Sequence, residues 1–340
     1  MAFKDDKNSD AQEETGLVRY GEEPPAQPKP SQPRPFVSAL IWCGFGAVAL
    51  TSIAVIGVAM VAYGISRGIS AKLSRSHLGA LASASVAGLI LGWLWVQGNL
   101  GVVLQGGVDL CIALVVGGLA AKKRANLTVD YAAAALATLA TIGLNWLVMS
   151  LAGEDFFAAI RSIIDTQVQA ISEASGLEMA AQIRSATWVI YLLWPFAYFV
   201  AAGLSVLAAH FAGWVARETP GTPPTWRAQA ADAPTWAMVV LIGSIALMAF
   251  NFLFGPLSQA AATVGASALM AVRFVFLLEG YGVLMWWLQK YQAGCLMRFL
   301  VILLALQLEA SFFVVSILGV VDFFANFRHL DRGEPKASAA

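Results

Sequence analysis

Long apolar runs recur along this chain and restrict what it can fold into. Most of them are close to the ~20 residues that a helix needs to cross ~30 Å of hydrocarbon. No alternating apolar and polar pattern, typical of strands, competes with them. Only 12% of the residues are charged, against about a quarter in soluble proteins. The sequence therefore predicts an all-α, polytopic transmembrane helical bundle with about eight spans, within a range of seven to nine. The runs cover residues 36–66, 78–96, 100–121, 131–151, 189–216, 235–254, 262–288 and 299–324.

Polar segments flank the predicted membrane domain, which covers residues 36–327. Residues 1–35 hold seven acidic residues, five basic residues and six prolines, and we expect a disordered tail with a polyproline-type linker. No basic segment leads directly into a short apolar core with a cleavage site, so we interpret the first run as a retained span and not as a signal peptide. Residues 328–340 are expected to form a polar carboxyl-terminal tail.

The segment 153–186 is a sizeable polar connection between two runs. Its apolar residues recur at helical spacing, and its five acidic residues outnumber its two basic ones. We therefore predict an amphipathic helix on the extracytoplasmic side of the bundle. Its role is open between a lid over a binding cavity and an interfacial helix that only packs on the bundle.

The charges of the loops indicate an orientation. The connections after the first, third, fifth and seventh runs hold ten Lys and Arg residues, whereas the other internal connections hold two, so the former are predicted to be cytoplasmic. Eight single crossings would then place both charged tails outside. A single helix over 36–66 would be about 46 Å long, too long for one crossing and short for two. We favour a helical hairpin there, which brings the amino tail inside, and find no equivalent solution for the carboxyl end.

Motifs that carry known chemistry are absent from the sequence. There is no GxxxxGK[ST] loop and no HExxH, and His77, His210 and His329 lie far apart without ligand spacing. We expect His210 to be a hydrogen-bonded interior histidine. The formal net charge is zero and the basic residues form no stripe, which argues against a nucleic-acid partner. We therefore expect no enzymatic activity, no catalytic residue, no bound metal and no cofactor.

Ionisable residues inside the predicted spans are the candidates for function. A charge in hydrocarbon is costly unless it is paired or faces the bundle interior or a water-filled cavity. Gln105 and Asp109 are four residues apart and lie on one helix face. Arg273 and Glu279 are six apart, about 240° around a helix, so they cannot easily pair with each other. Each needs a partner from another helix, and Glu309 or Asp109 is the expected counter-ion of Arg273.

These residues define a candidate ligand-binding set, and two interpretations of it remain open. In the first, they surround a cavity between the amphipathic helix and the polar faces of the third, seventh and eighth runs, with Arg273 facing an anionic group. In the second, they are buried ion pairs that fix helix register without any ligand. The set comprises Gln105, Asp109, Asn251, Arg273, Glu279 and Glu309.

Short motifs in the carboxyl-terminal half resemble a known family. The run 279–283 (EGYGV) contains Gly280, the run 318–322 (LGVVD) contains Gly319 and Asp322, and Arg328 closes the motif NFR. These motifs resemble the signature of the YybS-like proteins, bacterial membrane proteins of unknown function grouped with the S components of energy-coupling-factor vitamin transporters. Residues 63–68 (YGISRG) resemble the end of that family's second membrane segment, a second reason for the hairpin. Glu279 stands where the family usually has glutamine.

The resemblance implies a multi-pass protein of the bacterial cytoplasmic membrane that captures a small solute from outside. It also implies separate ATPase and coupling subunits as partners. The alternative function is a non-transporting membrane scaffold that recruits envelope or division proteins. In that case the buried charges serve only to lock helix packing.

Overall fold

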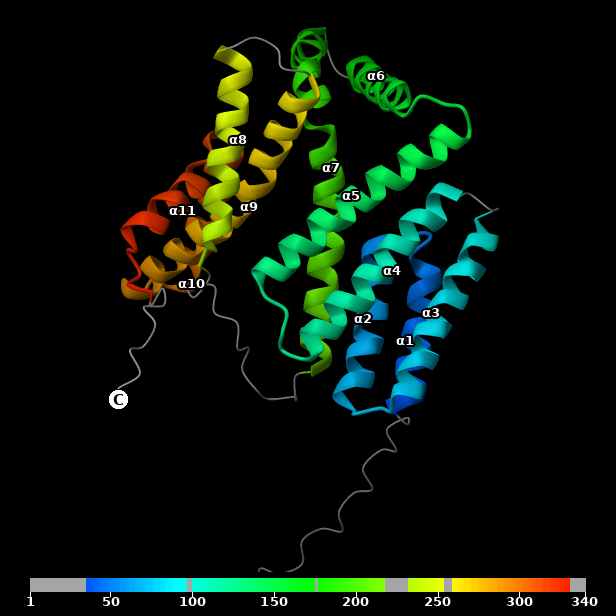
Figure 1. The fold of residues 1–340 in the computed structure, drawn as a ribbon. Helices are drawn as coiled ribbons and strands as arrows, with labels where there is room; N and C mark the ends of the chain where they lie inside the picture. Colours follow the sequence, from blue (N-terminus) through cyan, green and yellow to red (C-terminus); the bar gives the residue numbers. More distant parts are fainter. Residues whose placement is uncertain (1–34, 97–99, 175–176, 218–231, 254–258, 331–340) are drawn as a thin grey trace, which may run out of the picture. The chain divides into compact units, whose positions relative to one another are not determined.

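The computed structural model describes residues 35–96, 100–174, 177–217, 232–253 and 259–330, though not the side chains of 177–181, 184–185, 251–253 and 259. In these ranges the chain forms helices and no strand, which confirms the all-α bundle (Figure 1). The predicted tail 1–35 and residues 331–340 fall almost wholly outside them. The helices are α1 (Pro35–Ala49), α2 (Ala54–Ser70), α3 (Arg75–Trp95), α4 (Leu100–Ala121), α5 (Leu127–Leu151), α6 (Phe156–Ala174), α7 (Leu177–Arg217), α8 (Thr235–Leu253), α9 (Gln259–Lys290), α10 (Cys295–Phe312) and α11 (Val314–Ala325).

Several of these helices can cross a membrane. Within the described ranges, six are long and apolar enough: α3, α4, α5, α7, α9 and α10. The apolar helices α1, α2, α8 and α11 are shorter. The multi-pass architecture is therefore supported, whereas the predicted number of eight spans is not confirmed. Large apolar side chains on these helices are widely exposed, including Leu91 at 62%, Leu139 at 67% and Val239 at 70%. Such a surface is expected where helices face lipid.

The first apolar run is two helices, as the hairpin prediction required. A Cβ atom on Gly57 would lie 2.5 Å from the backbone nitrogen of Leu50, and one on Gly64 would lie 2.7 Å from the sulfur of Cys43. Position 57 thus faces position 50 and position 64 faces position 43, so α1 and α2 run antiparallel. The two glycines let the helices approach to backbone contact, as small residues do in membrane bundles.

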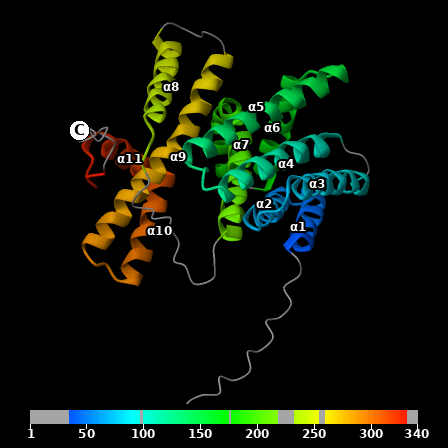
Figure 2. The same ribbon diagram turned by 60° about the horizontal axis from the view of Figure 1, so that its bottom comes forward.

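The run 299–324, predicted as a single span, is divided between two helices, of which α10 alone is long enough to cross a membrane. The run is interrupted at Phe313, whose φ of +58° is rare for a bulky residue, between α10 and α11. Figure 2 shows α10 and α11 as two separate helices. After α11 the chain returns to the end of α9, where the ring of Phe327 lies 6.4 Å from that of Trp287. Helix α10 starts just beyond Lys290, at the same end of α9. The chain therefore enters α10 and leaves α11 at the same end of the bundle. This arrangement supplies the solution for the carboxyl end that the sequence did not offer.

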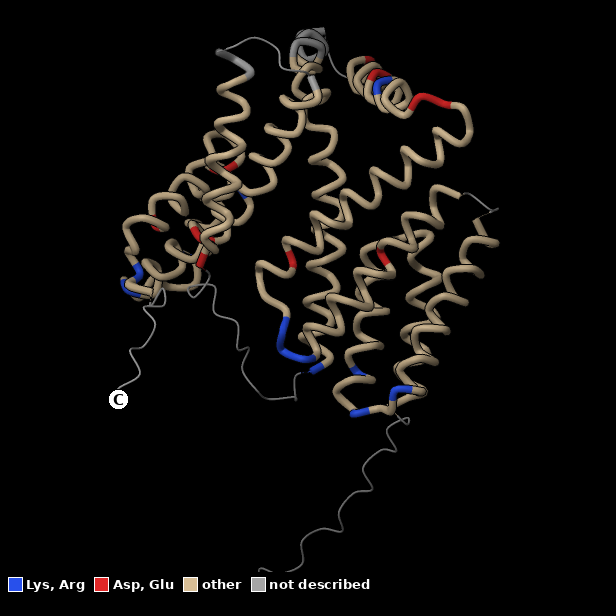
Figure 3. Tube along the Cα trace, viewed as in Figure 1, with Lys and Arg blue, Asp and Glu red and all other residues tan. Residues whose placement is uncertain are grey.

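The amphipathic helix of the polar segment is present as α6. It is shorter than the predicted range 153–186, because α6 ends at Ala174 and α7 begins at Leu177. Figure 3 shows α6, with its acidic residues, at the opposite end of the helices from the basic turns that follow α2 and α4 and the basic end of α7. This separation of charge agrees with the orientation predicted from the loops.

Candidate functional site

Arg273 of α9 pairs with Glu309 of α10 at the break between α10 and α11. The Nη2 and Nε atoms of Arg273 lie 2.7 and 2.8 Å from Oε1 of Glu309. The guanidinium carbon lies 3.9 Å from the ring centre of Phe313, a cation–π contact with the residue that forms the break. Of the two counter-ions expected for Arg273, Glu309 and Asp109, the structure shows Glu309.

The carboxylate of Glu309 also caps the start of α11. The backbone N–H groups of Val315 and Ser316 each donate to Oε2 at 3.0 Å, and the hydroxyl of Ser316 donates to Oε1 at 2.5 Å. These N–H groups have no partner within the helix, and a negative charge there is favourable. Glu309 is only 5% exposed and both its oxygens are engaged, so its surroundings are those of a structural lock.

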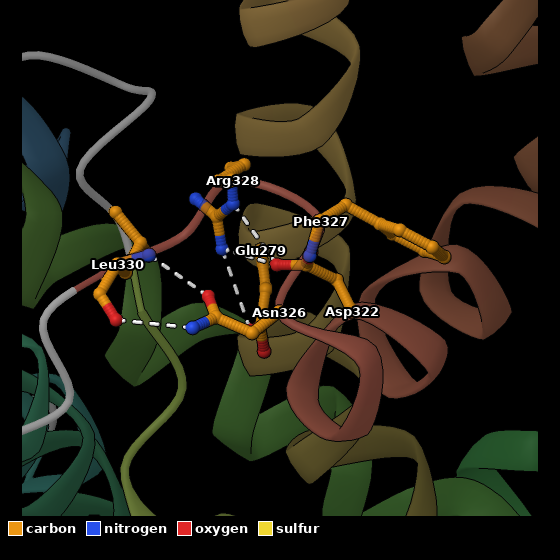
Figure 4. A network of polar contacts seen from close by, with 6 residues as sticks. All are labelled: Glu279, Asp322, Asn326, Phe327, Arg328 and Leu330. Atoms are coloured by element: carbon orange, nitrogen blue, oxygen red, sulfur yellow. Dashed lines mark hydrogen bonds and ion pairs between the residues drawn. The ribbon is translucent and has the colours of Figure 1, made fainter.

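A second ion-pair cluster joins α9 to the segment after α11. Arg328 donates from Nε and Nη2 to Oδ2 of Asp322 at 2.9 and 2.7 Å, and its Nη2 lies 3.4 Å from Oε1 of Glu279 (Figure 4). The three side chains are at most 1% exposed. Arg328, which the sequence placed at the start of the polar tail, is therefore inside the bundle. The prediction that Arg273 and Glu279 do not pair is confirmed.

The chain around this cluster is held by its own short bonds. The backbone N–H of Phe327 donates to Oδ1 of Asp322 at 2.8 Å. The side chain of Asn326 accepts from the N–H of Leu330 at 2.9 Å and donates to its carbonyl at 3.1 Å. Figure 4 shows these bonds within the segment from Asp322 to Leu330, with the side chain of Arg328 directed toward Glu279 of α9.

Two glycines of the family-like motifs make this meeting of helices possible. A Cβ atom on Gly280 of α9 would lie 2.0 Å from the carbonyl oxygen of Val315, and one on Gly319 of α11 would lie 1.9 Å from that of Phe276. Both distances are far below van der Waals contact. Backbones touch directly at this crossing, which brings Asp322 and Glu279 close enough to share Arg328.

The remaining predicted site residues lie elsewhere. Asp109 of α4 is 1% exposed and accepts a bond of 3.2 Å from the amide nitrogen of Gln105, as their spacing suggested. Asn251 lies in α8, but its side chain is outside the described residues. His210 bonds through Nδ1 to Asp130 of α5 at 2.6 Å, so the expected hydrogen bond is present, but its side chain is 34% exposed and only partly interior.

An apolar cavity of about 520 Å³ lies beneath α6, between α5, α7 and the start of α9. Its polar lining groups are Arg161, Tyr191 and Thr263. Trp194 forms one wall, and its ring lies 5.8 Å from that of Phe156 and 6.5 Å from that of Phe157. The other lining residues are Leu139, Ile142, Trp146, Ile160, Pro195, Ala260 and Val264. A hollow of about 480 Å³ on α6 is lined by that helix alone, so it cannot enclose a ligand.

A cavity beneath the amphipathic helix was predicted, but its other walls were assigned to the third, seventh and eighth runs because the sequence search followed charge; the observed walls are α5, α7 and the start of α9. Arg273 and Glu309 do not line it, and most of its wall is aromatic or aliphatic. One available signal was Pro195, since a proline inside a membrane helix leaves a carbonyl without its usual donor and often adjoins a cavity. A second was the amphipathic helix, because α6 is fastened over the cavity by the hydroxyl of Tyr191, which donates to Asp165.

Comparison with known proteins gives one family. A family model described as "Predicted membrane protein (DUF2232)" matches residues 53–323, which is most of the chain. The searches of curated proteins and of solved structures return no match.

Proposed function

The chain belongs to the DUF2232 family of predicted membrane proteins, and from that premise we propose that it is a small-solute-binding component of a membrane uptake system. The observation that carries the proposal is the cavity of about 520 Å³ beneath α6. Small-molecule sites are typically concave, about 300–1,000 Å³ in volume, and mostly apolar with a few polar groups. The cavity has each of these properties.

The lining indicates the class of solute. Trp146, Trp194 and Phe157 offer rings to a flat or apolar body. Arg161 offers a guanidinium at the edge contributed by α6, where an anionic group would be favoured. The proposed ligand is therefore a small amphipathic molecule with an apolar body and one acidic group.

Helix α6 is the lid in this proposal. It packs mainly against α7, where the hydroxyl of Tyr191 donates to Asp165 and the rings of Phe156 and Phe157 contact Trp194. A helix that packs mainly against one neighbour can move away and admit a ligand, because lids are usually segments of low local stability.

The finer part of the proposal concerns partners and location. The resemblance of the motifs around Gly280, Gly319 and Arg328 to YybS-like proteins supports an S-component role in the bacterial cytoplasmic membrane, without enzymatic activity of its own. The sequence has no GxxxxGK[ST] loop, so ATP-driven uptake would need separate ATPase and coupling subunits.

A second function is favoured by a different observation. Arg273 and Arg328 are both held in ion pairs with buried acids, which is what a non-transporting scaffold would need from its charges. Such a scaffold would recruit envelope or division proteins and leave the cavity empty.

The experiment that tests the proposal is native mass spectrometry of the full-length protein, purified in mild detergent from its own host. Trp194→Ala removes a wall of the cavity, whereas Trp188→Ala removes a tryptophan from the same helix that is 66% exposed and does not line it. We expect a bound small molecule with the wild type and with Trp188→Ala, and its loss with Trp194→Ala.

The same spectra report the partners. A co-purifying P-loop ATPase would support the uptake system. An empty protein accompanied only by envelope or division proteins would refute the solute-binding function and favour the scaffold.

A further inference from the structure

Asp109 is a buried acid to which the described part of the chain offers no basic partner. It lies in the middle of α4 and is 1% exposed. Its Oδ2 accepts a bond from Gln105, and the hydroxyl of Ser205 on α7 faces the same carboxyl group. Its Oδ1 is buried and has no hydrogen-bond partner. This differs from Glu309, both of whose oxygens are engaged.

The helices around α4 bring no compensating charge to Asp109. Helices α2, α3, α5 and α7 pack against α4, and none of the ion pairs formed by the described residues includes Asp109. Titratable side chains on these helices have other contacts. Arg67 lies over the ring of Tyr63, His77 bonds to Ser74, Asp130 bonds to His210, Tyr131 packs on Phe199, and Arg217 donates to the carbonyl of Ala120.

A mostly apolar pocket with three polar lining groups lies beside Gln105, the residue that bonds to this carboxyl group. It has a volume of about 290 Å³, lies between α4, α5 and α7, and has Gln105, Thr141 and Tyr198 as its polar lining groups. A pocket of this size with several polar groups can hold water. Gln105 therefore faces the pocket while its amide bonds to the carboxyl group, which places Asp109 one side chain from a possible source of protons.

A carboxylate buried without a cation is costly in hydrocarbon, and the usual relief is uptake of a proton. One proton added at Oδ1 would remove the negative charge, while Oδ2 keeps its bond from Gln105. A metal ion would require several further oxygen ligands, whereas the amide of Gln105 presents N–H groups, which are donors.

We propose that Asp109 is a proton-binding site at the interface of α4, α5 and α7, filled and emptied through the pocket beside Gln105. The carboxylate takes one proton to become a neutral carboxylic acid and releases it again, with no other bond formed or broken. The site is separate from the proposed solute cavity, because the two share no lining residue.

The test uses dicyclohexylcarbodiimide, an apolar reagent that adds to protonated carboxylic acids and leaves a stable adduct. The full-length protein in lipid nanodiscs is treated over a range of pH and mapped by peptide mass spectrometry. We expect an adduct on Asp109 whose yield falls by about tenfold for each pH unit above the titration midpoint. Glu309 is the internal control and should stay unlabelled, because its pair with Arg273 holds it charged.

Two variants keep the test decisive. Asp109→Asn should lose the adduct, with folding checked by its elution as a single species. Gln105→Leu removes the bond that favours the carboxylate and should extend labelling to higher pH. Absence of the adduct from the folded wild type at every pH would overturn the proposal. Protection by sodium ions that does not change with pH would also overturn it and would assign the site to a metal cation.

Discussion

Gly319→Ala should be among the most damaging single-methyl additions in the described bundle. The new Cβ atom would lie 1.9 Å from the carbonyl oxygen of Phe276, whereas ordinary contact begins at 3.4 Å. Helices α9 and α11 would have to separate by about 1.5 Å, the difference of these two distances. The obstacle is backbone, which cannot rotate away like a side chain. We therefore expect a loss of about 3 kcal/mol, the upper end of the range for overpacking, or more.

The assay is thermal unfolding in detergent, followed by tryptophan fluorescence or by loss of the monodisperse peak. The matched control is Gly143→Ala on α5, where an added Cβ atom meets nothing within 4 Å. This control should be neutral or stabilising by up to about 1 kcal/mol, since alanine is the better helix former. If Gly319→Ala unfolds at the same temperature as Gly143→Ala, the backbone contact between α9 and α11 does not exist.

Two further predictions concern the ion pairs. Glu309→Gln should destabilise by about 1–3 kcal/mol, because one of its oxygens is replaced by a donor facing either Arg273 or the backbone N–H groups of α11. Glu173→Gln, on the exposed face of α6, should change the melting temperature little, and equal losses would contradict the capping role. Arg328→Met should destabilise by about 3–5 kcal/mol by leaving Asp322 and Glu279 buried without that cation. Adding Glu279→Gln should restore part of the loss, and a double variant as unstable as the single one would refute the shared pairing.

Much of the fold could be predicted because it follows from helix length and from the position of charge. The run 36–66 has the wrong length for one helix, and glycines such as Gly57 and Gly64 allow it to fold back on itself. The six-residue spacing of Arg273 and Glu279 argued against a pair on one helix and left Glu309 and Asp109 as candidate partners of Arg273.

The break at Phe313 could not be predicted in the same way. No glycine or proline marks it, and the residues around it are apolar on both sides. The break is stabilised by contacts between helices and not by local sequence. Glu309 caps α11, and Arg273 lies on the ring of Phe313. The lining of the cavity beneath α6 could not be predicted for a related reason, since its aromatic residues do not differ in sequence from a surface that faces lipid.

The cluster of Glu279, Asp322 and Arg328 has a consequence for how the protein is made. Glu279 leaves the ribosome 49 residues before Arg328, so α9 enters the bilayer before the arginine that pairs with this acid has been made. The acid must be neutral at that stage or be sheltered by the insertion machinery. Arg328 follows α11, and its arrival adds a cation beside the acid in the bundle. The packing of α9 against α11 is therefore completed only after Arg328 has been synthesised.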